Sequence, residues 1–361
     1  MNIAVLIGRT ILKNPHITEN ELAKEIHLSL DKTNEQLKNM QNNGLITIKE
    51  DNGYFLTDAG MNFMQKYKVD NAIITAAGFG SRFVPLSYEM PKGLLEVLGE
   101  RMVERQIKQL HDAGITDITI VVGYLKEKFE YLIDKYNVKL IYNPEYSSKN
   151  SLSTLYHVRH LLKNTYILAS DNWLRDNIYN EYEPAAWYSG AYMQGDTSEW
   201  CLITDKDNLV TDVQIGGADS YVMYGPAYFD REFSEKYRAY VEEYYDTPGT
   251  ENFYWEQIVK DKLHDLKFYC NCRPDNTVYE FENLEELRLF DTKYQNNSGN
   301  AALEYIARVF EVSENEITCI KCLKSNAGDK SFLFNVKGES YIFNDSGTTT
   351  DPSINKAEKN N

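Results

Sequence analysis

Strand and helix patterns alternate through the middle of the chain. Short apolar runs typical of buried strands lie at 73–77, 118–122, 138–142 and 165–170. Between them, apolar residues recur at helical spacing at 103–113, 129–136 and 152–162. Alternation at this pitch predicts an α/β domain with a mostly parallel sheet over residues 69–294. Such sheets bind ligands at the carboxyl ends of their strands.

The first 68 residues predict a separate domain of three short helices and a β-hairpin. Thr18 is placed to cap a helix that begins at Glu19, with Glu21 at the capping-box position. A second helix from about Asp31 carries Leu37 and Met40 inward. The runs 45–48 and 54–57 then flank a turn at 50–53, as in a wing. Residues 1–68 therefore look like a winged helix-turn-helix domain.

The charge of this domain argues against strong DNA binding. Residues 1–68 hold eight Lys or Arg and eight Asp or Glu, a net charge of zero. In the expected recognition helix, Lys32 and Lys38 are balanced by Asp31 and Glu35. Neutralised phosphates supply most non-specific DNA affinity, so a docking or ligand-sensing role is the favoured alternative.

The chain turns polar at 295–300, which predicts a linker. A helix at 301–312 and a hairpin that turns at Lys337-Gly338 follow, and together they predict a small α+β segment at 295–343. Residues 344–361 are expected to be disordered.

Composition narrows the class of protein. With 361 residues, 42% of them hydrophobic, the chain is long enough for two or three domains, and no apolar run approaches the roughly 20 residues of a membrane helix. A cytoplasmic location is the default expectation. A net charge of −16 argues against a general nucleic-acid surface. The cysteine pairs Cys270/Cys272 and Cys319/Cys322 are better explained as reduced thiols than as a zinc site.

A glycine-rich turn after the first strand of the α/β domain is the strongest chemical signal. The run Ala76-Ala77-Gly78-Phe79-Gly80-Ser81-Arg82 ends a buried strand, and Lys92 follows ten residues later. Backbone N–H groups of such a turn point into one concavity and can hold phosphates. The spacing matches neither the dinucleotide fingerprint nor the Walker P-loop, and Gly-x-Gly alone would indicate only a tight turn.

Two further features suggest a metal and a cationic substrate. Asp171 follows the strand at 165–170, where a carboxylate can hold magnesium, although a helix cap is the commoner role. Phe253-Tyr254-Trp255 is an aromatic cluster followed by Glu256. Aromatic rings can bind a trimethylammonium group, but rings at helical spacing are usually core.

The string A-A-G-F-G-S-R-F-V-P-L-S-Y-E-M-P-K-G-L-L-E-V-L-G-E-R-M-V-E-R-Q-I, from Ala76 to Ile107, resembles the signature of nucleotidyltransferases that make nucleotide-sugars and CDP-alcohols. This resemblance implies a Rossmann-like fold for the α/β domain. With V-V-G-Y-L-K-E-K-F-E-Y-L, S-D-N-W-L, S-E-W and F-Y-W-E-Q-I-V-K-D, the chain is similar to LicC-type CTP:phosphocholine cytidylyltransferases over roughly 70–294.

The resemblance implies transfer of CMP from CTP to phosphocholine, with Mg²⁺, for choline decoration of cell-surface glycans. It implies these roles: phosphate contacts at Lys92 and Arg82; nucleotide contacts at Ala76, Ala77, Gly78, Gly80, Ser81, Asn150, Ser151 and Thr154; magnesium ligands at Asp171 and Glu256; and choline contacts at Trp200 and Tyr254, with Trp255, Tyr192 and Trp173 as further candidates. The family usually has aspartate where this chain has Glu256, which leaves the metal geometry there less certain.

Other readings stay open. The same scaffold would serve 2-aminoethylphosphonate or another amino-alcohol phosphate, whose primary ammonium would favour an acceptor such as Glu199. A different class of protein would be a winged-helix regulator that uses the transferase domain as a ligand sensor. The tail resembles the first strands of a LicA-type choline kinase. The oligomeric state is left open.

Overall fold

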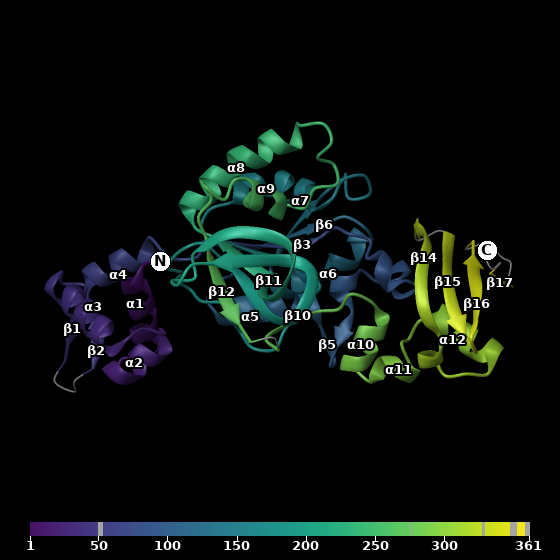
Figure 1. Cartoon of the computed structure of the whole chain (residues 1–361), viewed down its shortest axis with the longest axis horizontal. Coiled ribbons are helices and arrows are strands. Elements are labelled where there is room, and N and C mark those ends of the chain that lie inside the picture. The colour runs from purple at the N-terminus through teal and green to yellow at the C-terminus, as the bar shows by residue number, and fades with distance from the viewer. Residues whose placement is uncertain (50–52, 275, 327–328, 347–351, 358–361) are drawn as a thin grey trace.

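The computed structural model describes residues 1–49, 53–274, 276–326, 329–346 and 352–357. Three units follow one another along the long axis of the molecule: an N-terminal domain, a central α/β domain and a C-terminal strand-rich unit (Figure 1). Within the described residues, no helix combines the length and the hydropathy that a bilayer span requires.

The N-terminal unit is a winged helix-turn-helix domain, as predicted. Its elements are α1 (Ile3–Lys13), α2 (Glu19–Glu25), α3 (Leu30–Asn42), β1 (Ile46–Ile48), β2 (Tyr54–Leu56) and α4 (Asp58–Gln65). Thr18 and Glu21 form the expected capping box. The predicted hairpin is present, while its turn residues 50–52 lie outside the described residues. Helix α4 was not predicted, and Thr57 caps it by accepting from the Gly60 N–H.

This domain packs on the α/β domain through α1 and α4. Val5, Met64 and Tyr182 form a buried cluster between the two units. Arg9 forms an ion pair of 3.0 Å with the buried Glu183. Helix α3 keeps its charged side chains exposed, and these are Asp31, Lys32, Glu35 and Lys38.

The central domain is built on a seven-stranded, mostly parallel sheet in the order β12-β10-β11-β8-β3-β6-β7. The strands are β3 (Asn71–Ala76), β6 (Ile118–Val122), β7 (Lys139–Tyr142), β8 (Thr165–Ala169), β10 (Trp187–Thr204), β11 (Val210–Phe229) and β12 (Tyr269–Arg273). Strand β11 runs antiparallel to both of its neighbours. The short strands β4 (Glu96–Val97), β5 (Glu100–Arg101), β9 (Asn172–Leu174) and β13 (Val278–Glu280) pair outside this sheet.

Helices cover both faces of the sheet (Figure 1). Helices α5 (Met102–Asp112) and α6 (Tyr131–Tyr136) bury Val103, Ile107 and Leu132 against one face. The other face is covered by α7 (Ser151–Val158), α8 (Arg231–Tyr245) and α9 (Glu256–Asp261). The predicted Rossmann-like arrangement is therefore confirmed.

The C-terminal unit contains α10 (Leu284–Phe290), α11 (Lys293–Asn296), α12 (Ala301–Phe310) and an antiparallel sheet of β14 (Thr318–Asn326), β15 (Asp329–Val336), β16 (Glu339–Asp345) and β17 (Ser353–Lys356). The sheet includes the predicted hairpin, which turns at Lys337 and Gly338, both at positive φ. Residues 353–356 were expected to be disordered but form β17, because they supply the backbone partners for the edge of β16. Residues 347–351 and 358–361 of that expected tail lie outside the described residues.

The C-terminal unit shares a hydrophobic core with the segment that follows the glycine-rich turn. Phe83 and Tyr88 are buried together with Phe332 and Phe334. The Tyr88 hydroxyl donates to the Ser331 carbonyl at 2.8 Å and accepts from its N–H at 3.3 Å. The predicted linker at 295–300 is thus part of a packed junction, in which Asn300 also caps α12.

Candidate active site

The glycine-rich turn lies at the carboxyl end of β3, between β6 and β8. Gly80 adopts φ +70°, a left-handed conformation that a larger residue would strain. The Tyr124 N–H donates to the Ala77 carbonyl at 3.0 Å, which ties the turn to the end of β6. A Cβ on Gly123 would lie 2.6 Å from that same carbonyl oxygen, so glycine is required for this close approach.

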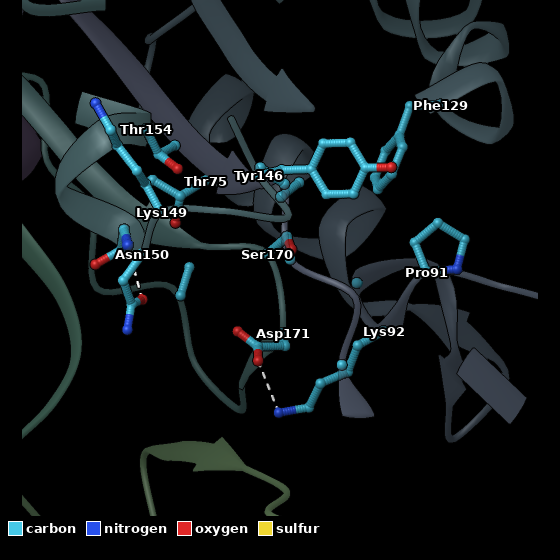
Figure 2. Close-up of a pocket in the computed structure, with 17 residues that line it drawn as sticks. Thr75, Pro91, Lys92, Phe129, Tyr146, Lys149, Asn150, Thr154, Ser170 and Asp171 are labelled. Carbon is cyan, nitrogen blue, oxygen red and sulfur yellow. Dashed lines mark hydrogen bonds and ion pairs between the residues drawn. The ribbon is translucent and has the colours of Figure 1, made fainter. Parts of the chain in front are cut away.

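A cavity of about 240 Å³ opens at this edge of the sheet (Figure 2). Its lining includes nine predicted site residues: Ala76, Ala77, Gly78, Gly80, Lys92, Asn150, Ser151, Thr154 and Asp171. It also includes residues that the sequence did not single out: Thr75, Pro91, Gly93, Phe129, Tyr146, Lys149, Ala169 and Ser170. The structure thus brings together the predicted phosphate turn, the start of α7 and the end of β8.

Lys92 and Asp171 both line the cavity, lie next to each other and form an ion pair of 2.7 Å (Figure 2). Their side chains are 11% and 24% exposed, so the pair is largely shielded from water. A Cβ on Gly93 would lie 2.5 Å from the Ser170 hydroxyl. Glycine at 93 therefore lets the turn that carries Lys92 pack directly against the residue before Asp171.

Two predicted phosphate-binding residues lie away from the cavity wall. Neither Ser81 nor Arg82 is among its lining residues. The Arg82 side chain is 67% exposed and pairs with Glu282, which follows β13. Lys149, which was not predicted, lines the cavity but directs its ammonium group to Glu145 at 2.8 Å, away from Asp171 (Figure 2).

A second carboxylate, Glu280, lies beside Asp171. Glu280 ends β13 and stands opposite Asn172 in the β9–β13 pairing, and the Asn172 amide donates to it at 3.2 Å. Burial, followed by repulsion from Asp171, raises the pKa of Glu280 to about 7. The sequence holds one signal for Glu280, which is its place at the end of the strand-like run Val278-Tyr279-Glu280.

Glu256, the second predicted magnesium ligand, is not among the residues that line the cavity, and neither is Glu280. Glu256 begins α9, and its Oε1 accepts from the Tyr188 hydroxyl at 3.2 Å. Its Oε2 is buried and has no hydrogen-bond partner among the described residues. Burial raises the pKa of Glu256 to about 7, and the nearby charge of Glu280 adds to this shift. The carboxylate that interacts with Asp171 is thus Glu280, because β13 returns to the edge of the sheet beside it.

The five predicted aromatic residues do not converge on one cage. Trp255 is buried and stacks on Tyr188 with ring centroids 5.6 Å apart. Trp173 is buried against Tyr279 and Phe290 in a different core cluster. Tyr192 and Tyr254 are 44% and 54% exposed. Of the five, Trp200 alone is half-buried at the surface of the core that contains Tyr188. The presence of aromatic residues in the sequence therefore does not show which rings are buried in the core and which line a pocket.

The cysteine pairs lie on different sheets, with Cys270 and Cys272 on β12 and Cys319 and Cys322 on β14. Across the described residues, no group of three or more His, Cys, Asp or Glu side chains is placed to hold one metal ion. The pair Asp171 and Glu280 supplies two carboxylates, and carboxylate oxygens are the ligands that Mg²⁺ takes together with substrate phosphates. This donor set fits a magnesium ion shared with a nucleotide.

Comparison with known proteins agrees with this geometry. The sequence profile of the family described as Nucleotidyl transferase matches residues 71–195, and that of Winged helix-turn-helix DNA-binding matches residues 7–47. The chain is 33% identical to the choline-phosphate cytidylyltransferase of Streptococcus pneumoniae over 227 residues, which are 63% of this chain and 99% of the relative. It is also 33% identical to the 2-aminoethylphosphonate cytidylyltransferase of Lancefieldella rimae, over 62% of this chain and 93% of that one.

The solved structures include a similar fold. A CTP:phosphocholine cytidylyltransferase from Streptococcus pneumoniae superposes with a TM-score of 0.59 at 34% sequence identity, covering 61% of this chain and 96% of the other. The match to nearly the full length of these relatives leaves the winged helix and the C-terminal unit as additions to the shared domain. The chain belongs to the nucleotidyl transferase family and is a nucleotidyltransferase.

Proposed function

We propose that the protein transfers CMP from CTP to phosphocholine, giving CDP-choline and pyrophosphate. The observation that carries this proposal is the Lys92–Asp171 pair in a cavity beside the glycine-rich turn, in a chain that is 33% identical to a choline-phosphate cytidylyltransferase over its full domain. The similarity to known cytidylyltransferases supports cytidylyl transfer to choline phosphate or to aminoethylphosphonate. We favour phosphocholine as the acceptor. The CDP-choline would then be made in the cytoplasm for choline decoration of cell-surface glycans.

The nucleotide would lie along the carboxyl edge of the sheet. Backbone N–H groups of the turn at 76–80 would hold the triphosphate, since glycine leaves room for close approach. Asn150, Ser151 and Thr154 line the opposite wall at the start of α7, where base and ribose would lie. Tyr146 also lines the cavity and offers a ring against which a base can stack.

The reaction is an in-line displacement at the α-phosphorus. A phosphate oxygen of the acceptor forms the new bond, and the bond to pyrophosphate breaks. The acceptor phosphate is already an anion at neutral pH, so no general base is needed, and catalysis depends on positioning and charge neutralisation. Lys92 is placed to leave Asp171 and meet the charge that develops on the phosphates. Arg82 comes soon after the turn in the chain and is paired with Glu282. When CTP binds, it would leave Glu282 and contact the phosphates.

Magnesium is the metal that this donor set suits. Asp171 and Glu280 would hold it, and Glu256, the ligand expected from the resemblance, is replaced in this role by Glu280. A bound Mg²⁺ would neutralise the triphosphate and the leaving pyrophosphate. It would also relieve the repulsion between the two carboxylates.

Two other functions have specific support. The equal identity to a 2-aminoethylphosphonate cytidylyltransferase makes that compound the leading alternative acceptor. The winged helix supports a regulator that senses ligand through the transferase domain, but the zero net charge of residues 1–68 favours catalysis over DNA binding. We retain the choline-kinase-like origin of the C-terminal unit as a proposal, based on its helix and antiparallel hairpin.

The experiment is pyrophosphate release over a matrix of the four nucleoside triphosphates and several acceptors: phosphocholine, 2-aminoethylphosphonate, phosphoethanolamine and glucose 1-phosphate. We expect turnover with CTP and phosphocholine above every other pair. A higher kcat/KM for 2-aminoethylphosphonate than for phosphocholine would make 2-aminoethylphosphonate the acceptor instead. No turnover with any pair of substrates would favour the winged-helix regulator that senses a ligand through the transferase domain.

A further inference from the structure

Gln106 is a buried polar residue that contacts the backbone around Asp171. It lies on α5, and its side chain is fully shielded from solvent. Its Nε2 donates to the Ala169 carbonyl at 2.9 Å and to the Asn172 carbonyl at 2.7 Å. Because both neighbours are carbonyl oxygens, the amide nitrogen must face them and the amide oxygen must point away. One side chain therefore holds the backbone on both sides of Ser170 and Asp171.

Ser170 and Asp171 line the cavity, and the same backbone is held from two further directions (Figure 2). The Ser170 N–H donates to the carbonyl of Thr75, near the end of β3, at 3.0 Å. Gly93 lies so close that a Cβ on it would be 2.5 Å from the Ser170 hydroxyl oxygen. The place of the Asp171 carboxylate is thus fixed by its surroundings, and Gln106 supplies the contact from α5.

The Gln106 amide carries a cost that packing alone does not require. Its Oε1 is buried and has no hydrogen-bond partner among the described residues. An apolar side chain of the same size would fill this space without burying an unpaired acceptor. The two donated bonds are therefore what glutamine contributes at this position. Loss of a group that orients a metal ligand typically lowers metal affinity about 10- to 100-fold, so such bonds matter most beside a metal site.

We propose that Gln106 is a positioning residue for the magnesium site, whose amide fixes the backbone that carries Asp171 and so sets how tightly the enzyme–nucleotide complex holds Mg²⁺. This inference rests on the proposed cytidylyl transfer, in which Asp171 holds the metal. Gln106 is not among the residues that line the cavity, so it acts through Asp171 and not on the substrate. Without its amide, the turn would have to be ordered as the metal binds, and that ordering weakens binding.

Gln109 provides a matched control three residues later on α5. It is also buried, its Nε2 donates to the Leu174 carbonyl at 3.2 Å, and its Oε1 likewise lacks a partner within the described part of the chain. Gln106→Met and Gln109→Met each remove one buried amide from the same helix, so both should lower the stability of the protein. The first alone removes the bonds that flank Asp171.

The test measures binding of α,β-methylene-CTP, which the enzyme cannot cleave, by isothermal titration calorimetry. The ratio of its Kd in EDTA to its Kd in Mg²⁺ reports how much the metal strengthens nucleotide binding. We expect Gln106→Met to lower this ratio at least about tenfold, with a Kd in EDTA close to that of the wild type. Gln109→Met should keep the wild-type ratio. In pyrophosphate release, Gln106→Met should need more Mg²⁺ for half-maximal turnover, and added Mg²⁺ should restore much of its rate.

Gln106→Asn gives the same comparison if Gln106→Met does not fold, because it keeps an amide that is one methylene too short to reach both carbonyls. A wild-type ratio close to one would overturn the inference without any variant, since Asp171 would then hold no metal. An unchanged ratio in Gln106→Met, or equal losses in the two methionine variants, would overturn the inference alone and leave the proposed transfer intact. If the wild type does not bind the analogue with or without Mg²⁺, the proposed function fails and the inference fails with it.

Discussion

The raised pKa of Glu280, which is buried and interacts with Asp171, predicts how the stability of the protein changes with pH. The pKa of Glu280 is raised to about 7 in the folded protein. An unfolded glutamate titrates near 4.3 to 4.5. Between these values the folded protein holds a proton that the unfolded chain has lost. The contribution of Glu280 to stability is therefore largest at low pH and is lost as pH rises to about 7.

The size of the effect follows from the two pKa values. With a folded pKa of about 7 and an unfolded pKa of about 4.5, the contribution falls by about 2.5 kcal/mol between pH 5 and pH 8. Glu280→Gln keeps the shape of the protonated side chain and removes the titration. The free energy of unfolding of the variant, relative to the wild type, should therefore rise by about 2.5 kcal/mol over this range.

Urea unfolding at pH 5, 6, 7 and 8 measures this difference, and pairing each variant point with the wild type cancels the other titrating groups. Repeating the pH 8 point with Mg²⁺ and CTP tests the metal role, because a cation between the carboxylates should stabilise the wild type more than Glu280→Gln. A difference between the two proteins that does not change with pH would refute the assignment of Glu280 as a buried carboxylate whose pKa is raised by burial and by Asp171.

Three further predictions concern single side chains. Lys92→Ala should lower kcat by about 10²- to 10³-fold in pyrophosphate release, because it removes one donor to the developing charge, and near-normal turnover would exclude the phosphate role. Trp200→Ala should raise KM for phosphocholine far more than KM for CTP, and equal effects would remove this ring from the acceptor pocket. Tyr88→Phe should lower the free energy of unfolding in urea by about 1–3 kcal/mol, because the backbone groups of Ser331 lose the hydroxyl that they bond. The matched variant Tyr305→Phe removes a hydroxyl that donates one bond of 3.3 Å, so it should lower the free energy of unfolding less. Equal losses in the two variants would contradict this account.

Local signals in the sequence were sufficient for much of the fold. The capping box at Thr18 and the period of the apolar runs predicted α2 and the parallel strands, because each depends on near neighbours in the chain. The long hairpin of β10 and β11 was missed. Many of its residues between 194 and 200 are exposed on both faces, so no alternation of apolar and polar side chains marks it.

The site was predictable where one continuous motif builds it. The turn at 76–80 and Asp171 lie together because they follow β3 and β8, which are neighbours in one sheet, and Lys92 joins them through its ion pair with Asp171. Glu280 was missed because its neighbour Asp171 is remote in sequence, and the pairing of β9 with β13 is what joins them. Trp173 and Trp255 were misplaced because burial among other rings depends on tertiary packing.

Transfer of label from [α-³²P]CTP to phosphocholine in the presence of Mg²⁺ tests the central claim most directly. The wild type should form labelled CDP-choline, identified by its mass, with one pyrophosphate released per molecule, and Lys92→Ala should form it at least about a hundredfold more slowly. Absence of labelled CDP-choline from the wild type, or equal rates in the two proteins, would contradict the account.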